Sequence, residues 1–224
     1  MSAAHANAPD AKAPVVVVAI DGPAGAGKST VGRAVAERLG LDYLDTGAMY
    51  RAVTFAALRR GIDPADADEV AAIADTVDMR LDGSSVRVDG VDATVEIRGR
   101  EVTAAVSSVA ANGRVRSELV RRQRSWVDEH GGGVVEGRDI GSVVFPDATL
   151  KLFVTASPRV RAERRVAEIG GDVVEVEASI IERDRKDSTR VESPLLESTD
   201  AVVVDTTGVA VADVVERIVG LLTA

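Results

Sequence analysis

The sequence predicts an α/β fold in which helices flank a parallel five-stranded sheet, with a small antiparallel β/α subdomain inserted into it. Three observations support this fold. A strand, a glycine-rich turn and a helix follow one another near the N-terminus. Short apolar runs then alternate with segments of helical spacing, and one internal stretch has the turn pattern of β-hairpins. Hydrophobic residues make up 46% of the 224-residue chain, which is enough for a substantial core.

The first strand is expected at Val15 to Ile20, a continuous β-branched run of the kind that is buried on both faces of a sheet. Residues 28–39 then show apolar residues at helical spacing, and Gly40 is placed to end that helix. A second short strand is expected at 41–44. This order of strand, glycine turn, helix and strand is typical of the opening of a parallel α/β sheet.

Later segments continue the pattern. Further strands are expected at 133–136, 150–155 and 201–205, and helices at 114–130, 158–169 and 209–222.

The segment from about 63 to 106 differs from its surroundings. A helix is expected at 66–75 and antiparallel strands at 78–81, 85–88 and 94–97. Asp-Gly pairs at 82–83 and 89–90 separate these strands, and Asp-Gly is a strong hairpin signal. We therefore expect an insert within one domain that covers residues 14–224.

Composition excludes several functions. The formal charge of −9 argues against non-specific binding to nucleic acid, and the absence of cysteine excludes disulfides and thiolate chemistry. Two histidines give little support for a histidine metal site. Residues 1–13 are small and polar and read as a flexible tail, and no run is long enough to cross a membrane. A soluble, cytoplasmic protein without membrane or nucleic-acid partners is expected.

Residues 22–29, GPAGAGKS, match the phosphate-binding pattern G-x-x-x-x-G-K-[ST]. The motif lies between a predicted strand and a predicted helix, which is the context that supports it. Its backbone N–H groups would surround the β-phosphate, Lys28 would bridge the β- and γ-phosphates, and the Ser29 hydroxyl could bind Mg²⁺. The expected ATP-binding residues are Gly22, Pro23, Ala24, Gly25, Ala26, Gly27, Lys28, Ser29 and Thr30.

A second phosphate site is indicated by residues 45–51, DTGAMYR, which follow the second predicted strand. Thr46 and Tyr50 fall on one side of a helix start, and Arg51 adds a guanidinium. A helix N-terminus with these groups can bind a phosphate dianion. A capped helix with a solvated arginine is the alternative.

Four ordered segments, IDGPAGAGKST, LDTGAMYR, EGRDIGSVVFPDA and ERDRKDSTR, together resemble the bacterial cytidylate kinase family of nucleoside monophosphate kinases. The resemblance runs from about Val15 to the C-terminus. It implies transfer of a phosphoryl group from ATP to CMP or dCMP in pyrimidine nucleotide metabolism, and a typically monomeric P-loop fold. It also implies an acceptor-binding insert at about 63–106 and a mobile helical lid at about 158–190.

The resemblance also implies site residues. Thr46 and Arg51 would bind the CMP phosphate, although many members have serine at the position of Thr46, and Tyr50 would line that pocket. The full set of implied CMP-binding residues is Thr46, Tyr50, Arg51, Ser107, Arg116, Arg138, Asp139, Arg183, Asp187 and Arg190.

Cytosine chemistry fits part of this set. Asp139 can accept the N4 amino proton, while Arg116 or Arg190 can donate to N3 or O2. Uracil reverses two of those roles and would leave buried groups unpaired, at a cost of about 1–3 kcal/mol each. A preference for CMP and dCMP over UMP is expected. A local salt bridge is the alternative reading of Arg138 and Asp139.

Two arginine-rich segments, at 159–165 and 183–190, suggest a phosphate clamp, with solvated helix faces as the alternative. Phosphoryl transfer needs alignment and charge neutralisation more than a general base, so Lys28 and a lid arginine are the expected catalytic residues. Arg161, Arg164, Arg183 and Arg185 are the candidates for that arginine, with Arg183 favoured first and Arg164 second. Ser29 is the expected metal ligand. Asp21, Asp45 and Glu136 are unranked candidates for a supporting carboxylate.

Other functions remain open at this point. Kinases that act on UMP, dTMP or shikimate share the phosphate loop. The cytosine-reading set argues against the first two, and the insert argues against shikimate kinase. A GTPase switch would usually contain N-K-x-D, which does not occur here, and would lack a second phosphate site. An RNA-binding module would need more stacking residues than one Trp, three Phe and two Tyr.

Overall fold

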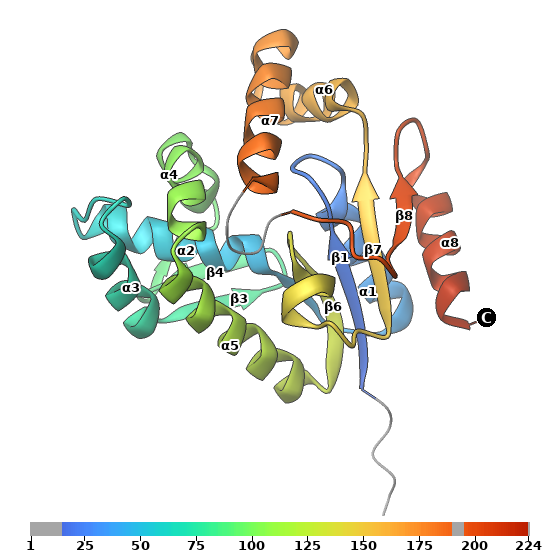
Figure 1. Cartoon of the computed structure of the whole chain (residues 1–224), viewed down its shortest axis with the longest axis horizontal. Coiled ribbons are helices and arrows are strands. Elements are labelled where there is room, and N and C mark those ends of the chain that lie inside the picture. The colour runs from blue at the N-terminus through green and yellow to red at the C-terminus, as the bar shows by residue number, and fades with distance from the viewer. Residues whose placement is uncertain (1–14, 190–194, 224) are drawn as a thin grey trace, which may run out of the picture.

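The computed structural model describes residues 15–189 and 195–223 (Figure 1). The expected tail at 1–13 and the expected site residue Arg190 lie outside the described residues. Within the described ranges, no helix is both long enough and apolar enough to cross a membrane.

The central sheet has five parallel strands, as the sequence predicts. Their spatial order is β2-β6-β1-β7-β8, so the first strand of the chain lies in the middle. Asp21 and Glu136 stand at the carboxyl ends of neighbouring strands, which is where open parallel sheets place their ligands. The strands are β1 (Val16–Asp21), β2 (Tyr43–Asp45), β6 (Gly132–Glu136), β7 (Leu150–Thr155) and β8 (Val202–Asp205).

Helices cover both faces of this sheet. Val31 and Val35 of α1 and Ile218 of α8 pack with Val18 and Ile20 on one face. Helices α2 and α5 cover the other face, and in Figure 1 the helices α2 to α5 lie to the left of the sheet and α8 to its right. The helices are α1 (Lys28–Leu39), α2 (Thr46–Arg59), α3 (Ala67–Thr76), α4 (Arg100–Ala110), α5 (Gly113–His130), α6 (Pro158–Ile169), α7 (Val173–Ser188) and α8 (Val211–Thr223).

The insert contains a three-stranded antiparallel sheet formed by β3 (Met79–Asp82), β4 (Ser85–Val88) and β5 (Val91–Asp92). Both Asp-Gly pairs form its turns, with positive φ at Gly83 and at Asp89 and Gly90. Helix α3 begins after Asp66, whose side chain accepts hydrogen bonds from the first turn.

The strand predicted at 94–97 is wrong. The chain forms the short β5 and then a 3₁₀ helix, η1 (Glu96–Arg98), before α4 begins. The reason is local, because the Asp92 carboxylate accepts hydrogen bonds from both the backbone N–H and the hydroxyl of Thr94. The Thr94 hydroxyl oxygen then accepts from Val86 N–H, in place of a further rung of the sheet.

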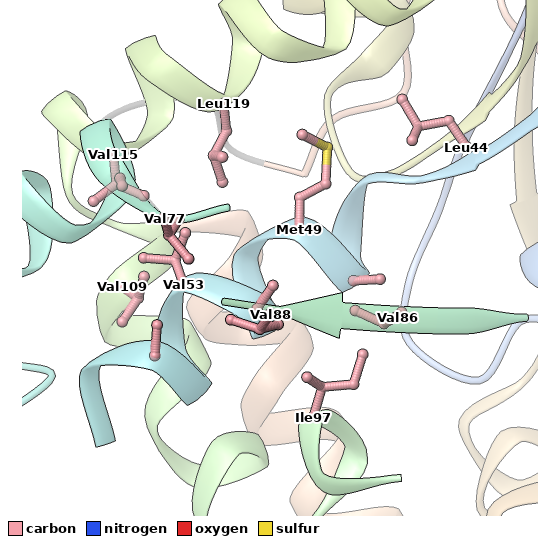
Figure 2. Packing of buried hydrophobic residues seen from close by; sticks show 14 of the residues in the cluster. Leu44, Met49, Val53, Val77, Val86, Val88, Ile97, Val109, Val115 and Leu119 are labelled. Carbon is pink, nitrogen blue, oxygen red and sulfur yellow. The ribbon is translucent and has the colours of Figure 1, made fainter. Parts of the chain in front are cut away.

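One continuous core joins the insert to the sheet. Side chains of β2, α2, the insert strands, η1, α4 and α5 belong to one buried cluster, part of which is drawn in Figure 2. The insert therefore extends the core on one face of the sheet and fixes α2, whose N-terminus lies beside the phosphate loop. The labelled members are Leu44, Met49, Val53, Val77, Val86, Val88, Ile97, Val109, Val115 and Leu119.

Helices α6 and α7 form a hairpin that follows β7 and stands beyond the carboxyl ends of the strands, above the phosphate loop in Figure 1. Ser157 caps α6, with Pro158 at its first position, and Asp172 caps α7. The hairpin places arginines over the edge of the sheet where β1 and β6 end.

Candidate active site

The phosphate loop connects β1 to α1 and packs closely against its neighbours. A side chain at Gly22 (φ 145°) would place a Cβ 1.9 Å from the Val154 carbonyl oxygen, so the loop requires glycine there. Gly27 (φ 90°) directs the chain into α1. The loop thus wraps the N-terminus of α1, where unpaired backbone N–H groups favour an anion.

Lys28 lies at the centre of this loop and is buried. Its Nζ donates a hydrogen bond to the Pro23 carbonyl oxygen at 2.9 Å. Burial, with a further contribution from the Arg138 guanidinium, lowers the pKa of Lys28 to about 7, while Glu136 and Asp45 oppose the shift. An anion in the loop would favour the charged form of this lysine.

Glu136, at the end of β6, is the carboxylate best placed to support a metal. The Ser29 hydroxyl donates to its Oε1 at 2.7 Å, while its buried Oε2 has no hydrogen-bond partner among the described residues. Burial, and then the charge of Asp45, raise the pKa of Glu136. A divalent cation would supply the missing partner and offset that cost, so Ser29 and Glu136 fit Mg²⁺.

The other two candidate carboxylates, Asp21 and Asp45, already accept hydrogen bonds from protein groups. Asp21 accepts hydrogen bonds from Ile140 N–H at 2.7 Å and Gly141 N–H at 2.8 Å, at the start of the π-helical turn η2 (Ile140–Val144). Burial raises the pKa of Asp21 to about 6. Asp45 caps α2 through Ala48 N–H. It also pairs with Arg98, a residue that no sequence motif singled out.

A cationic cluster lies beside the N-terminal half of α2. Burial first, and then the charges of Arg183 and Arg98, lower the pKa of Arg51 to about 10. Arg51 donates to the Ile97 carbonyl and to the Thr103 hydroxyl, both at 2.9 Å. The cluster unites arginines from α2, η1 and α7, so it is suited to a phosphate dianion.

Thr46 is buried at the start of α2, and its hydroxyl donates to the Glu136 carbonyl oxygen at 2.7 Å. This bond directs the hydroxyl proton toward β6. The role of Thr46 in binding phosphate stays a prediction.

Arg116 and Asp139 form a buried ion pair between α5 and the segment after β6. The Arg116 guanidinium lies 5.9 Å from the centre of the Tyr50 ring. The structure thus brings together three of the predicted acceptor-site residues. Ser107 lies half-buried on α4, and its role in reading cytosine stays a prediction.

Arg138 extends from the end of β6 to α7, where its Nε donates to the buried Asp187 carboxylate at 3.0 Å. Because Arg138 also lies close enough to Lys28 to influence its pKa, this pair connects the helical hairpin to the phosphate loop.

Arginines of α6 are connected to the phosphate loop by hydrogen bonds. Arg161 donates to the Ala24 carbonyl at 3.1 Å and pairs with Asp184 of α7 at 2.6 Å. Arg164 donates to the hydroxyl and the carbonyl of Thr206, and that hydroxyl donates to the Ala26 carbonyl. Arg183 of α7 belongs instead to the cationic cluster, where its charge adds to the effect of burial in lowering the pKa of Arg51.

Sequence reasoning missed Arg98 and Thr206 as neighbours of the site. Arg98 belongs to η1, where a strand was expected, and Thr206 follows β8 at the far end of the chain. Neither stands in a phosphate-binding motif, so only the fold reveals them.

The fold and the site define a P-loop kinase. Solved structures with this fold include a sugar kinase from Janibacter sp. (15% identity, 94% of this chain and 95% of that chain) and a gluconokinase from Sinorhizobium meliloti (17% identity, 93% and 91%), each with a TM-score of 0.51. At these identities the likeness concerns the fold alone.

The chain belongs to the cytidylate kinase family, whose model matches residues 18–224. The cytidylate kinase of Mycobacterium avium is 51% identical over 212 residues, which cover 91% of this chain and 93% of that protein. That of Mycobacterium leprae is 49% identical and covers 92% and 95%. The bifunctional pantoate ligase/cytidylate kinase of Prochlorococcus marinus is 49% identical over 216 residues, and the match spans 44% of its length.

Proposed function

We propose that this protein catalyses the ATP-dependent phosphorylation of CMP and dCMP to CDP and dCDP. The observation that carries the proposal is a pair of neighbouring cationic groups, Lys28 in the phosphate loop and the cationic cluster around Arg51, each suited to a phosphate. Asp45 lies within the electrostatic reach of both groups, so the two sites are close together. Two phosphate sites side by side suit transfer between two nucleotides.

The donor side of the proposal places ATP on the loop from Gly22 to Thr30. Lys28 would leave the Pro23 carbonyl for the β- and γ-phosphates, and the N-terminus of α1 would add backbone donors. Ser29 and Glu136 would hold Mg²⁺, which when bound would neutralise phosphate charge.

The acceptor side places the CMP phosphate beside the cationic cluster, with Thr46, Arg51 and Arg138 as its partners and Tyr50 lining the pocket. In-line attack by a phosphate oxygen needs no general base, because that oxygen is already ionised. The residues of this site therefore act by alignment and by charge.

The cytosine ring is assigned to the Arg116–Asp139 pair. Asp139 offers a carboxylate to the N4 amino group, and Arg116 offers donors to N3 and O2. Both residues are buried, so a uracil ring would leave unpaired polar groups away from water. Ser107 and Arg190 are assigned to the same base, and Asp187 with Arg183 to the ribose.

Residues 14–224 are assigned to one kinase domain, with 63–106 as the acceptor-binding insert and 158–190 as the lid. Closing of the α6–α7 hairpin would exclude water and bring Arg183 and Arg164 toward the transferred phosphoryl group. We assign a monomer acting in pyrimidine nucleotide metabolism in the cytoplasm.

An acceptor panel tests the proposal. Purified protein with Mg-ATP is given CMP, dCMP, UMP, AMP, GMP or shikimate, and ADP release is followed. CMP and dCMP should raise ADP release well above the acceptor-free rate, and UMP less so. An acceptor-free rate that no CMP concentration raises would exclude the function, and stimulation by shikimate alone would reassign the acceptor.

A further inference from the structure

We propose that Tyr43 is a positioning residue whose hydroxyl orients the Glu136 carboxylate beside Ser29 for Mg²⁺. The inference rests on the proposed ATP-dependent function, and it concerns a residue outside the phosphate-binding motifs.

The sheet register brings the two side chains to one face. In the parallel pairing of β2 with β6, Tyr43 is opposite Val134 and Asp45 is opposite Glu136. Paired residues of parallel strands direct their side chains to the same face, and residues two apart share that face. Val134 packs in the core beneath α1, so Tyr43 and Glu136 are both directed toward α1 and the phosphate loop.

Helix α1 is built to receive the tyrosine ring. A Cβ at Gly32 would lie 2.9 Å from Tyr43 Cε2 and 3.4 Å from Ile20 Cδ1. Glycine is unfavourable within a helix, so a glycine on this turn has a packing reason. Its missing side chain leaves the space that the ring occupies, one turn from Ser29.

Arg33 holds the ring from a second direction. Its guanidinium carbon lies 4.6 Å from the ring centre, a cation–π contact. The same guanidinium donates to the Gly83 carbonyl at 2.8 Å, in the turn between β3 and β4. The ring is therefore fixed by α1 and by the insert together.

The hydroxyl end of the ring is buried and needs a partner. Neither the Tyr43 hydroxyl nor Glu136 Oε2 has a hydrogen bond of normal geometry in the described part of the chain. Burial raises the pKa of the Tyr43 hydroxyl, the Glu136 carboxylate raises it further and the Ser29 hydroxyl lowers it, so this hydroxyl lies near both groups. A small rotation would let this hydroxyl donate to the carboxylate. A carboxylate held in this way by a second group is a better oriented metal ligand.

The test measures ATP binding by calorimetry with and without Mg²⁺, in the absence of acceptor. Tyr43→Phe keeps the ring and removes only the hydroxyl. We expect the Mg²⁺-dependent gain in ATP affinity to fall by about 10-fold, because loss of an outer partner of a metal ligand has effects of that order. ATP affinity without Mg²⁺ should be unchanged, since the phosphate loop is intact. Arg38→Met, which alters an exposed arginine of α1, is the matched control.

A second background makes the test specific. Glu136→Gln should itself lose the Mg²⁺-dependent gain, and adding Tyr43→Phe to it should have no further effect. Arg33→Met removes the guanidinium that packs on the Tyr43 ring and should also reduce the Mg²⁺-dependent gain in ATP affinity. Because Arg33 is partly exposed, this variant replaces Tyr43→Phe if Tyr43→Phe does not fold.

Two results would overturn the proposal. One is a folded Tyr43→Phe, or Arg33→Met in its place, that keeps the full Mg²⁺-dependent gain. The other is a loss of ATP affinity that is equal with and without Mg²⁺, because that would indicate a general structural effect. If Mg²⁺ strengthens ATP binding but CMP is not phosphorylated, CMP is not the acceptor and the proposed function is wrong. The calorimetric comparison then still tests the role of Tyr43, because it contains no acceptor.

Discussion

Binding of ATP should be accompanied by proton uptake at Lys28. With a pKa lowered to about 7, this lysine is mostly neutral at pH 8 before nucleotide binds. Phosphate oxygens would reverse the effect of burial and restore the charged form. At pH 8 only about one-tenth of the lysine carries a proton, so full charging takes up about 0.9 proton per ATP.

Calorimetry in buffers of different ionisation enthalpy measures this uptake directly. The titration is made at pH 8 without Mg²⁺ and without acceptor, where the nucleotide phosphates are largely ionised and Glu136 has no cation to bind. The observed enthalpy should vary linearly with buffer ionisation enthalpy, with a slope that corresponds to about 0.9 proton.

Lys28→Arg is the matched control, since a guanidinium stays charged and should give a slope near zero. A wild-type slope near zero would refute the reasoning, because Lys28 would then be charged before ATP binds. A slope that persists in Lys28→Arg would assign the proton to another group.

Three further outcomes follow from the same site. Asp139→Asn should reduce the preference for CMP over UMP in kcat/KM by about 5- to 150-fold, the equivalent of 1–3 kcal/mol for unpaired buried groups, and unchanged discrimination would remove Asp139 from base reading. Arg183→Met should lower kcat by about 10²- to 10³-fold. Arg185→Met, which alters an exposed arginine paired with Glu182, should leave kcat unchanged. Equal losses in the two variants would mean that the total positive charge of the lid matters and not the position of Arg183. Asp21, whose pKa is raised by burial from 3.8 to about 6, contributes stability that is fully present below pH 3.8 and is lost as pH rises through 6. The free energy of unfolding of wild type relative to Asp21→Asn should therefore fall by up to about 3 kcal/mol from pH 4 to pH 7, and parallel denaturation curves would contradict it.

The parallel sheet was predictable because its signals are local. The apolar run that forms β1, the glycine turn and the helical spacing of α1 each depend on neighbouring residues, and the predicted bounds of α1 and α6 match the structure. The last helix begins at Val211 instead of Val209, a difference of the size expected at helix ends.

The features that the sequence did not predict depend on side-chain hydrogen bonds, which residue propensities do not include. A 3₁₀ helix replaces the strand expected at 94–97, because the Thr94 hydroxyl donates a hydrogen bond to Asp92 and accepts one from the Val86 N–H. The resulting 3₁₀ helix places Arg98 next to Asp45, a contact between residues 53 positions apart. The sequence also could not rank Asp21, Asp45 and Glu136 as carboxylates that support Mg²⁺. Only the fold shows that the Ser29 hydroxyl donates to Glu136 and that backbone N–H groups donate to Asp21.

The central claim is that the γ-phosphoryl group moves from ATP to the phosphate of CMP. The most direct measurement uses ATP labelled in the γ-phosphate, incubated with enzyme, Mg²⁺ and CMP, with the products separated. Label in the β-phosphate of CDP, in equal amount to the ADP formed, is the predicted result. Label that appears only as inorganic phosphate, with or without CMP, would contradict the account.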